Sequence, residues 1–173
     1  MIRALALTLT LIATANALAA AEQGKFEQSK LFAGFQKPFI SQGQYTLSDE
    51  QLVWHTQQPV VSELKIDASG VYERQIDGTY TQQANTGPYG ALLPALLAQD
   101  THALERYFSA EAVAPPAALA AHNYECVQLT PVTGELKSVF SHFISCAQQS
   151  QVRFIGLYEG NGTTTDIILT PDH

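Results

Sequence analysis

Hydrophobic and polar residues alternate in several stretches of the chain, which is typical of strands with one buried face. The pattern is clearest where two runs rich in aromatic and β-branched residues, Gln44–Leu47 and Leu52–Thr56, flank the polar break Ser48–Gln51. Trp54, the only tryptophan, shares a strand face with Leu52. The pattern therefore predicts a hairpin with a large apolar face that another element must cover.

Similar patterns predict further strands on both sides of a central segment. We expect strands at Lys25–Phe32, Ile40–Leu47, Val60–Asp67, Val71–Ile76, Tyr124–Thr130, Ser138–Cys146, Val152–Glu159 and Thr163–Thr170. Leu64 and Ile66 fall on one face of their strand, and Tyr72 shares a face with Ile76. Asn161-Gly162 predicts a hairpin turn before the last strand, although Asn161 also begins an N-glycosylation triplet.

The hydrophobic period changes in the centre of the chain. Between Pro88 and Ala98, four leucines recur at helical spacing, and Asp100-Thr101 is a capping pair for a second helix with Leu104, Tyr107 and Phe108 on one stripe. The alanine-rich run from Pro115 to Ala121 predicts a further short helical piece. The sequence therefore predicts a helical insert at about residues 88–121 between two β meanders.

The N-terminal segment, residues 1–21, differs from the rest. Arg3 is its only charge, an apolar run follows, and Ala17-Leu18-Ala19 is a small-x-small cleavage pattern. We interpret it as a cleaved secretory signal peptide. The alternative is an uncleaved membrane anchor, but the apolar run is shorter than the roughly 20 residues that a spanning helix needs. Residues 22–173 are then expected to form one domain.

Composition limits the classes of partner. The chain has 173 residues, 46% of them hydrophobic, which suits one domain with a substantial core. It carries 9 basic and 16 acidic residues, a net charge of −7. Nucleic acid and anionic lipid head groups are therefore poor candidates for electrostatic partners.

Two cysteines, Cys126 and Cys146, fall on consecutive predicted strands. An exported protein meets an oxidising compartment, so we expect them to form a disulfide. A redox or metal site is the alternative, but neither a C-x-x-C motif nor metal-ligand spacing is present.

No catalytic constellation stands out in the sequence. The five histidines are scattered, and no glycine-rich phosphate loop is present. Ser62 and Lys65 match the S-x-x-K motif of serine acyltransferases, but that serine opens a helix and here the segment reads as a strand. We therefore expect a protein that is not an enzyme and uses no cofactor or metal, with a hydrolase of unrecognised type as the alternative.

Several short motifs follow one another in a distinctive order. They are F-x-Q-x-K from Phe26, KPFISQGQ from Lys37, LVW from Leu52 with Pro59 after it, A-L-L-x-x-L-L-A-x-D ending at Asp100, Leu104 with Phe108, LTP from Leu129, and EGNGTTTDIIL from Glu159. In this order they resemble the LolA-like superfamily of periplasmic carriers of outer-membrane lipoproteins, especially the branch associated with aryl polyene lipid biosynthesis. The resemblance runs from about Phe26 to the C-terminus.

The resemblance implies a mainly β (α+β) fold, an incomplete antiparallel β-barrel closed by a lid of short helices over an apolar cavity for acyl chains. The expected lining of that cavity is Leu52, Trp54, Leu64, Ile66 and Tyr72 on the sheet, with Leu92, Leu93, Leu96, Leu97, Leu104 and Phe108 on the lid. Two features depart from the carriers: the turn before the Trp54 strand contains no arginine, and Lys25 follows the predicted cleavage site too closely for a preceding helix.

The implied function is a soluble, monomeric periplasmic carrier for an acylated lipid or lipoprotein. It would take this cargo from an inner-membrane exporter to an outer-membrane acceptor, and the exported location follows from the predicted signal peptide. The alternative is a non-catalytic lipid-sensing or interaction domain on the same fold.

Overall fold

The computed structural model describes residues 21–49, 51–84, 89–121 and 123–172. The predicted signal peptide lies outside these ranges apart from Ala21. The strands are β1 (Glu22–Leu31), β2 (Phe39–Leu47), β3 (Gln51–Gln58), β4 (Ser62–Asp67), β5 (Gly70–Arg74), β6 (Tyr80–Gln82), β7 (Phe108–Val113), β8 (Glu125–Pro131), β9 (Phe140–Gln148), β10 (Gln151–Glu159) and β11 (Thr164–Pro171). The helices are α1 (Tyr89–Leu97), α2 (Thr101–Leu104), the 3-10 turn η1 (Ala117–Leu119) and α3 (Gly134–Lys137).

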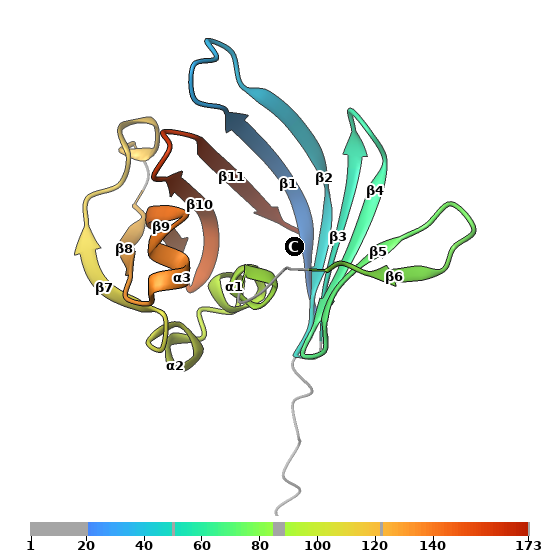
Figure 1. The fold of residues 1–173 in the computed structure, drawn as a ribbon. Coiled ribbons are helices and arrows are strands. Elements are labelled where there is room, and N and C mark those ends of the chain that lie inside the picture. Colours follow the sequence, from blue (N-terminus) through green and yellow to red (C-terminus); the bar gives the residue numbers. More distant parts are fainter. Residues whose placement is uncertain (1–20, 50, 85–88, 122, 173) are drawn as a thin grey trace, which may run out of the picture.

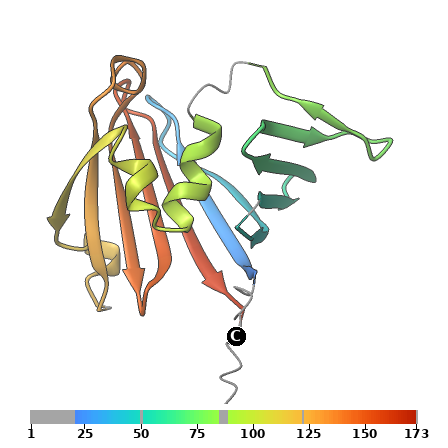
Figure 2. The same cartoon turned by 90° about the horizontal axis from the view of Figure 1, so that it is seen from below.

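The described strands form one 11-stranded sheet in the order β6-β5-β4-β3-β2-β1-β11-β10-β9-β8-β7. Every neighbouring pair is antiparallel. The first and last long strands, β1 and β11, lie side by side, so the two meanders join into one surface. The sheet curls around α1 and α2 without closing, which is the incomplete antiparallel barrel predicted from the sequence (Figures 1 and 2).

The predicted strands are confirmed, with ends shifted by a few residues. The turn at Asn161-Gly162 is also present: Gly162 has a φ of 91°, and the Thr163 amide donates to Asn161 Oδ1 at 2.8 Å. The sequence patterns did not predict β6, β7 or α3; β6 has only three residues and α3 only four. No helix within the described ranges is long and apolar enough to cross a membrane.

The second helix is shorter than predicted. Asp100 caps α2 as expected, because its Oδ1 accepts a hydrogen bond from the Ala103 amide at 3.0 Å. The helix ends at Leu104, and Phe108 begins β7, which pairs with β8 along its whole length. The prediction of a helix continuing through Phe108 was wrong because the backbone groups there complete the edge of the sheet instead.

The third predicted helical piece lies on the other side of the sheet. It contains η1, and Leu119 packs against Cys126, Cys146 and Phe154, whose side chains point away from α1. The lid therefore consists of α1 and α2, and not of the whole predicted insert.

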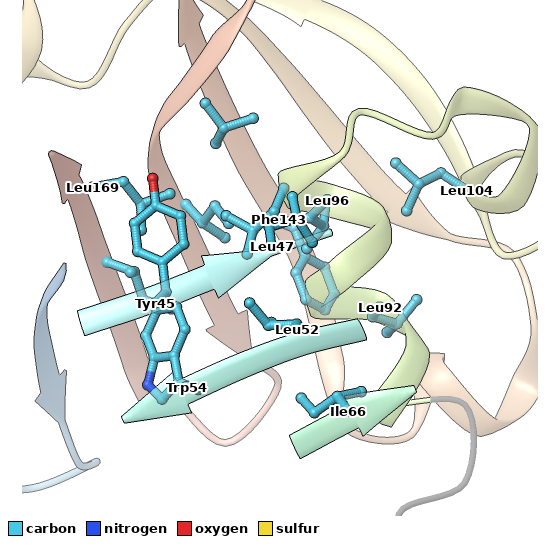
Figure 3. Packing of buried hydrophobic residues seen from close by; sticks show 14 of the residues in the cluster. Tyr45, Leu47, Leu52, Trp54, Ile66, Leu92, Leu96, Leu104, Phe143 and Leu169 are labelled. Atoms are coloured by element: carbon cyan, nitrogen blue, oxygen red, sulfur yellow. The ribbon is translucent and has the colours of Figure 1, made fainter. Parts of the chain in front are cut away.

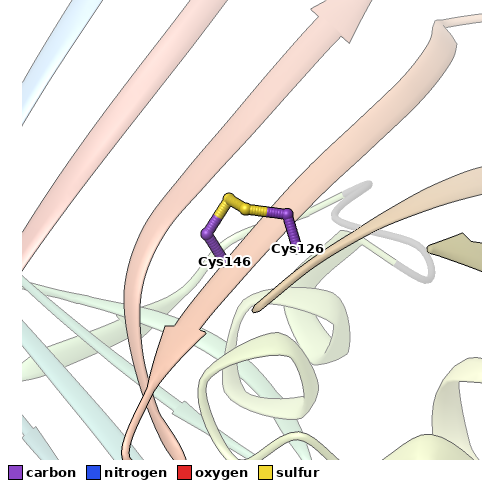
Figure 4. The surroundings of a disulfide bond; sticks show 2 residues. All are labelled: Cys126 and Cys146. Atoms are coloured by element: carbon purple, nitrogen blue, oxygen red, sulfur yellow. A yellow bond between two sulfur atoms is a disulfide. The ribbon is translucent and has the colours of Figure 1, made fainter. Parts of the chain in front are cut away.

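Cys126 and Cys146 pair directly across β8 and β9 and form a disulfide, with an S–S distance of 2.08 Å (Figure 4). This confirms the predicted pairing. Together with Phe154, the bond forms a small second core on the convex face. The disulfide links β8 to β9, next to the edge strand β7.

The strand register decides which side chains face the lid. Leu52 pairs with Ile66, and Ile66 pairs with Val71, so these three share the concave face. Tyr72 pairs with Lys65 on the opposite face, where Lys65 Nζ lies 4.9 Å from the tyrosine ring centroid. The predicted place of Tyr72 in the cavity lining is therefore wrong, and Val71, which is buried, occupies that position.

Candidate functional site

The helix α1 lies on the concave face and buries its leucines against the sheet (Figure 3). Leu96 is only 2% exposed, and Leu92 and Leu97 are also buried. Leucines at positions three, four and five apart cover most of one side of a short helix, so α1 presents a broad apolar surface. It contacts a cluster that includes Leu52 and Ile66 of the sheet. The helix thus covers the large apolar face that the hairpin pattern predicted.

A tight polar link holds α2 beside α1. Gln99 adopts a left-handed φ of 51°, and the Asp100 amide donates to the Ala95 carbonyl at 2.9 Å. The Gln99 side-chain amide also donates to the Ser150 carbonyl, in the turn between β9 and β10, at 3.3 Å. The end of the lid is therefore attached to the sheet by this side-chain hydrogen bond as well as by its leucines.

An apolar pocket of about 270 Å³, here called the β7–β9 pocket, lies between the lid and strands β7, β8 and β9. Its apolar walls are Leu96, Leu104, Phe108, Ala110, Val127, Leu129 and Ala147. Polar contributions come from Gln99, Thr101, Glu105, Glu125 and Ser145. Small-molecule sites usually measure roughly 300–1,000 Å³, so this space in its present form fits a short apolar group.

A second space, of about 590 Å³, lies on the other side of the lid against the lower ends of β2, β3 and β4, and is called the β2–β4 pocket. Four carboxylate residues line it: Glu22, Asp49, Asp67 and Asp100. The β7–β9 pocket likewise has two glutamates. The charged residues that line both spaces are therefore carboxylates, which disfavours an anionic head group.

A partly buried side-chain hydrogen bond links β1 and β2 beside the β2–β4 pocket. Tyr45 is almost fully buried and donates its hydroxyl to Glu22 Oε1 at 2.7 Å. Burial, followed by this bond to Glu22, raises the pKa of Tyr45 well above its ordinary value. Tyr45 therefore stays neutral and remains a hydrogen-bond donor at any pH at which the protein works.

The structure brings ten of the eleven predicted cavity residues together on the concave side. Eight are buried in one cluster: Leu52, Trp54, Ile66, Leu92, Leu96, Leu97, Leu104 and Phe108. Leu64 and Leu93 are partly buried against it, and Tyr72 lies apart. Four of the ten border a pocket, namely Ile66, Leu96, Leu104 and Phe108. Their role in binding an acyl chain remains a prediction.

Sequence reasoning missed part of the β7–β9 pocket wall. Val127 and Leu129 are two residues apart on β8 and share the face that looks at the lid, opposite Cys126. The alternation in E-C-V-Q-L-T-P was a signal that could have identified them, because the two apolar residues there have strand spacing. Ala110 and Ala147 are too small to stand out in a hydrophobic pattern.

The described residues contain no group of three or more His, Cys, Asp and Glu side chains arranged to hold a metal ion. The Ser62 side chain lies on β4, as the sequence predicted, rather than at the start of a helix. The arrangement on the concave side therefore offers apolar surface and space beneath two short helices.

No family model and no curated protein matches this chain. Among solved structures, a LolA superfamily protein from Nitrosomonas europaea is similar with a TM-score of 0.41 and 7% identity, over 87% of this chain and 84% of that one. A protein named for outer membrane lipoprotein sorting, from Vibrio parahaemolyticus, has a TM-score of 0.34 and 5% identity, over 87% and 83%. A DUF1329 family protein from Desulfovibrio piger has a TM-score of 0.35 and 8% identity, over 87% and 83%. Similarity at this level assigns neither a family nor a function to the chain.

Proposed function

We propose that this protein is a soluble periplasmic carrier that binds the acyl chain of a lipid or lipoprotein between its lid and the concave face of its sheet. The observation that carries the proposal is the β7–β9 pocket, an apolar space directly beneath two short helices. A carrier needs apolar surface beneath a cover, and apolar side chains make up most of the wall of this pocket.

The hydrophobic effect supplies the driving force for binding an acyl chain in an apolar site. Each CH₂ removed from water contributes about 0.8 kcal/mol, so a chain of ~16 carbons gains on the order of 10 kcal/mol in an apolar site. The existing pocket is too small for such a chain, which therefore has to displace α1 and join the spaces on its two sides. The leucines of α1 fill the concave face in the empty protein, and the acyl chain replaces them in the loaded one.

The charges narrow the class of cargo. Glu105 and Glu125 border the β7–β9 pocket, and Glu22, Asp49 and Asp100 are among those around the β2–β4 pocket. An ionised fatty acid would bring its carboxylate close to these groups. An acyl chain attached to a neutral or cationic group, as an ester or amide, avoids that repulsion.

Two features support the periplasmic compartment in this proposal. The disulfide between Cys126 and Cys146 suits an oxidising compartment, and the N-terminal segment has the pattern of a signal peptide. In the proposal the monomeric carrier takes its cargo from an inner-membrane exporter and passes it to an outer-membrane acceptor.

The test is binding of a fluorescent acyl ester, combined with mass spectrometry of any lipid that purifies with the protein. Ala110→Trp fills the β7–β9 pocket from β7 without removing a core side chain, and should weaken binding about tenfold or more. Ser109→Trp is the matched control, because Ser109 is exposed on the other face of the same strand. We expect the ester to bind more tightly than the corresponding free fatty acid.

If the wild-type protein binds no acyl probe and carries no lipid, the carrier proposal is wrong. The fold would then be better read as a non-catalytic interaction domain. If Ala110→Trp and Ser109→Trp bind equally well, the chain lies elsewhere than in the β7–β9 pocket.

A further inference from the structure

Four large apolar side chains are exposed together at the connection between β1 and β2, here called the aromatic tip: Phe32, Phe35, Phe39 and Ile40. Phe35 is 60% exposed and Phe39 57%. The three rings contact one another edge to face, with centroids 5.4 to 6.1 Å apart. Figure 1 shows this connection projecting beyond the ends of the neighbouring strands. An exposed cluster of this kind on a soluble domain marks an interaction site.

The tip is held in place rather than loose. Gly34 adopts a φ of 84°, and the Phe35 amide donates to the Phe32 carbonyl at 3.0 Å, which closes the turn. The Ala33 amide donates to Thr163 Oγ1 at 3.3 Å and so attaches the turn to the loop between β10 and β11. The hydrogen-bonded backbone of the turn therefore holds the rings in their exposed positions. Their exposure does not come from a lack of structure in the segment.

The charge of the tip differs from that of the whole protein. The segment from residue 28 to residue 48 contains Lys30 and Lys37 and no acidic residue, although the chain as a whole carries −7. Lys30 Nζ lies 5.1 Å from the Phe32 ring centroid and also pairs with Glu159 at 3.4 Å. Aromatic and aliphatic side chains flanked by lysines match the interfacial zone of a bilayer, where rings enter the head-group region and ammonium groups meet phosphate.

Two further apolar side chains lie at the same end of the sheet. Val60 and Val61, in the connection between β3 and β4, are both strongly exposed. The register of β2 with β3 places this connection at the end of the sheet where β1 leads into the tip. A standard protein interface buries about 800 Å² on each partner and needs a matching face, which separate hairpin tips offer poorly. A bilayer needs no such complementarity.

We propose that the aromatic tip docks this protein on a phospholipid bilayer, with the three phenylalanines inserted among the head groups and Lys37 close to lipid phosphate. The tip lies at the end of β1 opposite Glu22, which lines the β2–β4 pocket. A ten-residue strand spans roughly 30 Å, so the docking surface and that pocket are separate. The proposal goes beyond the carrier function, and the two can be tested independently.

The experiment is flotation of the purified protein, its N-terminus established by intact mass, with vesicles of phosphatidylcholine alone or of equimolar phosphatidylcholine and phosphatidylglycerol. The wild-type protein should float with both and better with the second. The double variant Phe35→Ser/Phe39→Ser should reduce the partition coefficient about tenfold or more. Ile76→Ser is the control, because Ile76 is a fully exposed apolar residue in the connection between β5 and β6.

Two variants sharpen the result. Lys37→Glu should remove the preference for phosphatidylglycerol while binding to phosphatidylcholine persists. A tryptophan introduced at Phe35 should show a blue-shifted emission when vesicles are added, above the constant signal of the buried Trp54, whereas a tryptophan introduced at Ile76 should not.

If the wild-type protein does not float with vesicles, the proposal is wrong, and the aromatic tip binds a protein partner instead. Equal flotation of the wild-type and double-variant proteins overturns it as well. Acyl-ester binding by the double variant should equal that of the wild type. If the ester fails to bind while flotation persists, the carrier function fails and the docking proposal stands.

Discussion

The Phe26 ring stacks on the Trp54 indole with ring centroids 3.8 Å apart and an interplanar angle of 22°. Phe26 lies on β1 and pairs with Gly43 on β2, whereas Trp54 lies on β3. The two rings meet over the strand between them because Gly43 has no side chain there. This stack links β1 to β3 across β2 on the concave face, so Gly43 is as necessary to it as the rings themselves.

Gly43→Ala should destabilise the protein by roughly 1–3 kcal/mol. A Cβ at this position would lie 2.0 Å from the His55 carbonyl oxygen and 2.8 Å from atoms of the Phe26 ring, so backbone and ring must both move. Urea unfolding measures the change. Gly134→Ala is the control, because its Cβ would meet nothing within 4 Å. Equal stabilities of the two variants would show that the strands yield easily and that the stack contributes little.

Truncation of the lid leucines should lower the unfolding free energy by different amounts. Leu97 is buried and Leu93 only partly buried, although both lie on α1. Leu97→Ala should lower the unfolding free energy by about 2–5 kcal/mol, as in a closed core, and Leu93→Ala by clearly less. Thermal and urea unfolding of both variants test this. Similar small losses for both would mean that the lid is loosely packed against the sheet.

Opening the disulfide should weaken the protein without changing its fold. The bond joins residues separated by 20 positions, which corresponds to about 3 kcal/mol in the chain-entropy treatment. The double variant Cys126→Ala/Cys146→Ala should therefore unfold at lower urea concentration and retain the circular dichroism of a β protein. Thiol labelling of the unreduced wild-type protein should find no free cysteine; two reactive thiols would contradict the bond.

The ionised Asp166 side chain should destabilise the folded protein, and this effect should depend on pH. It is half buried on β11, and this burial raises its pKa above the ordinary value. The native state then holds its proton to higher pH than the unfolded state does, so stability decreases as pH rises from the unfolded pKa through the raised native pKa. Asp166→Asn removes this penalty and should be more stable than the wild type at neutral pH.

The control for that experiment is Asp77→Asn. Hydrogen bonds from Thr79 lower the pKa of the exposed Asp77, so its ionised form is favoured in the native state and the substitution should not stabilise the protein. Unfolding curves at several pH values give the difference from wild type. An Asp166→Asn protein with an unchanged pH profile would show that this carboxyl is hydrated in the folded state.

Most strands could be located from the sequence alone, because β1 to β5 and β8 to β11 each carry their own local signals. Alternation located the strands, Asn161-Gly162 located a turn, and Asp100 located the start of α2. The cysteine pairing was also readable, since Cys126 and Cys146 lie on consecutive strands that pair directly. These features depend on neighbours in the chain, and local physical chemistry is sufficient to determine them.

The tertiary structure decided what local patterns leave open. Val71 and Tyr72 are adjacent and both apolar enough to be buried, so only the pairing of β5 with β4 shows that Val71 faces the lid, because a shift of one residue exchanges the faces. Phe108 fitted the apolar stripe of the predicted helix, but its backbone pairs with the edge of β8 and therefore belongs to a strand. The α1 leucines fill part of the concave face and leave two spaces beside them. How much they fill depends on how strands that are far apart in sequence curve around one helix. No local sequence pattern contains that information.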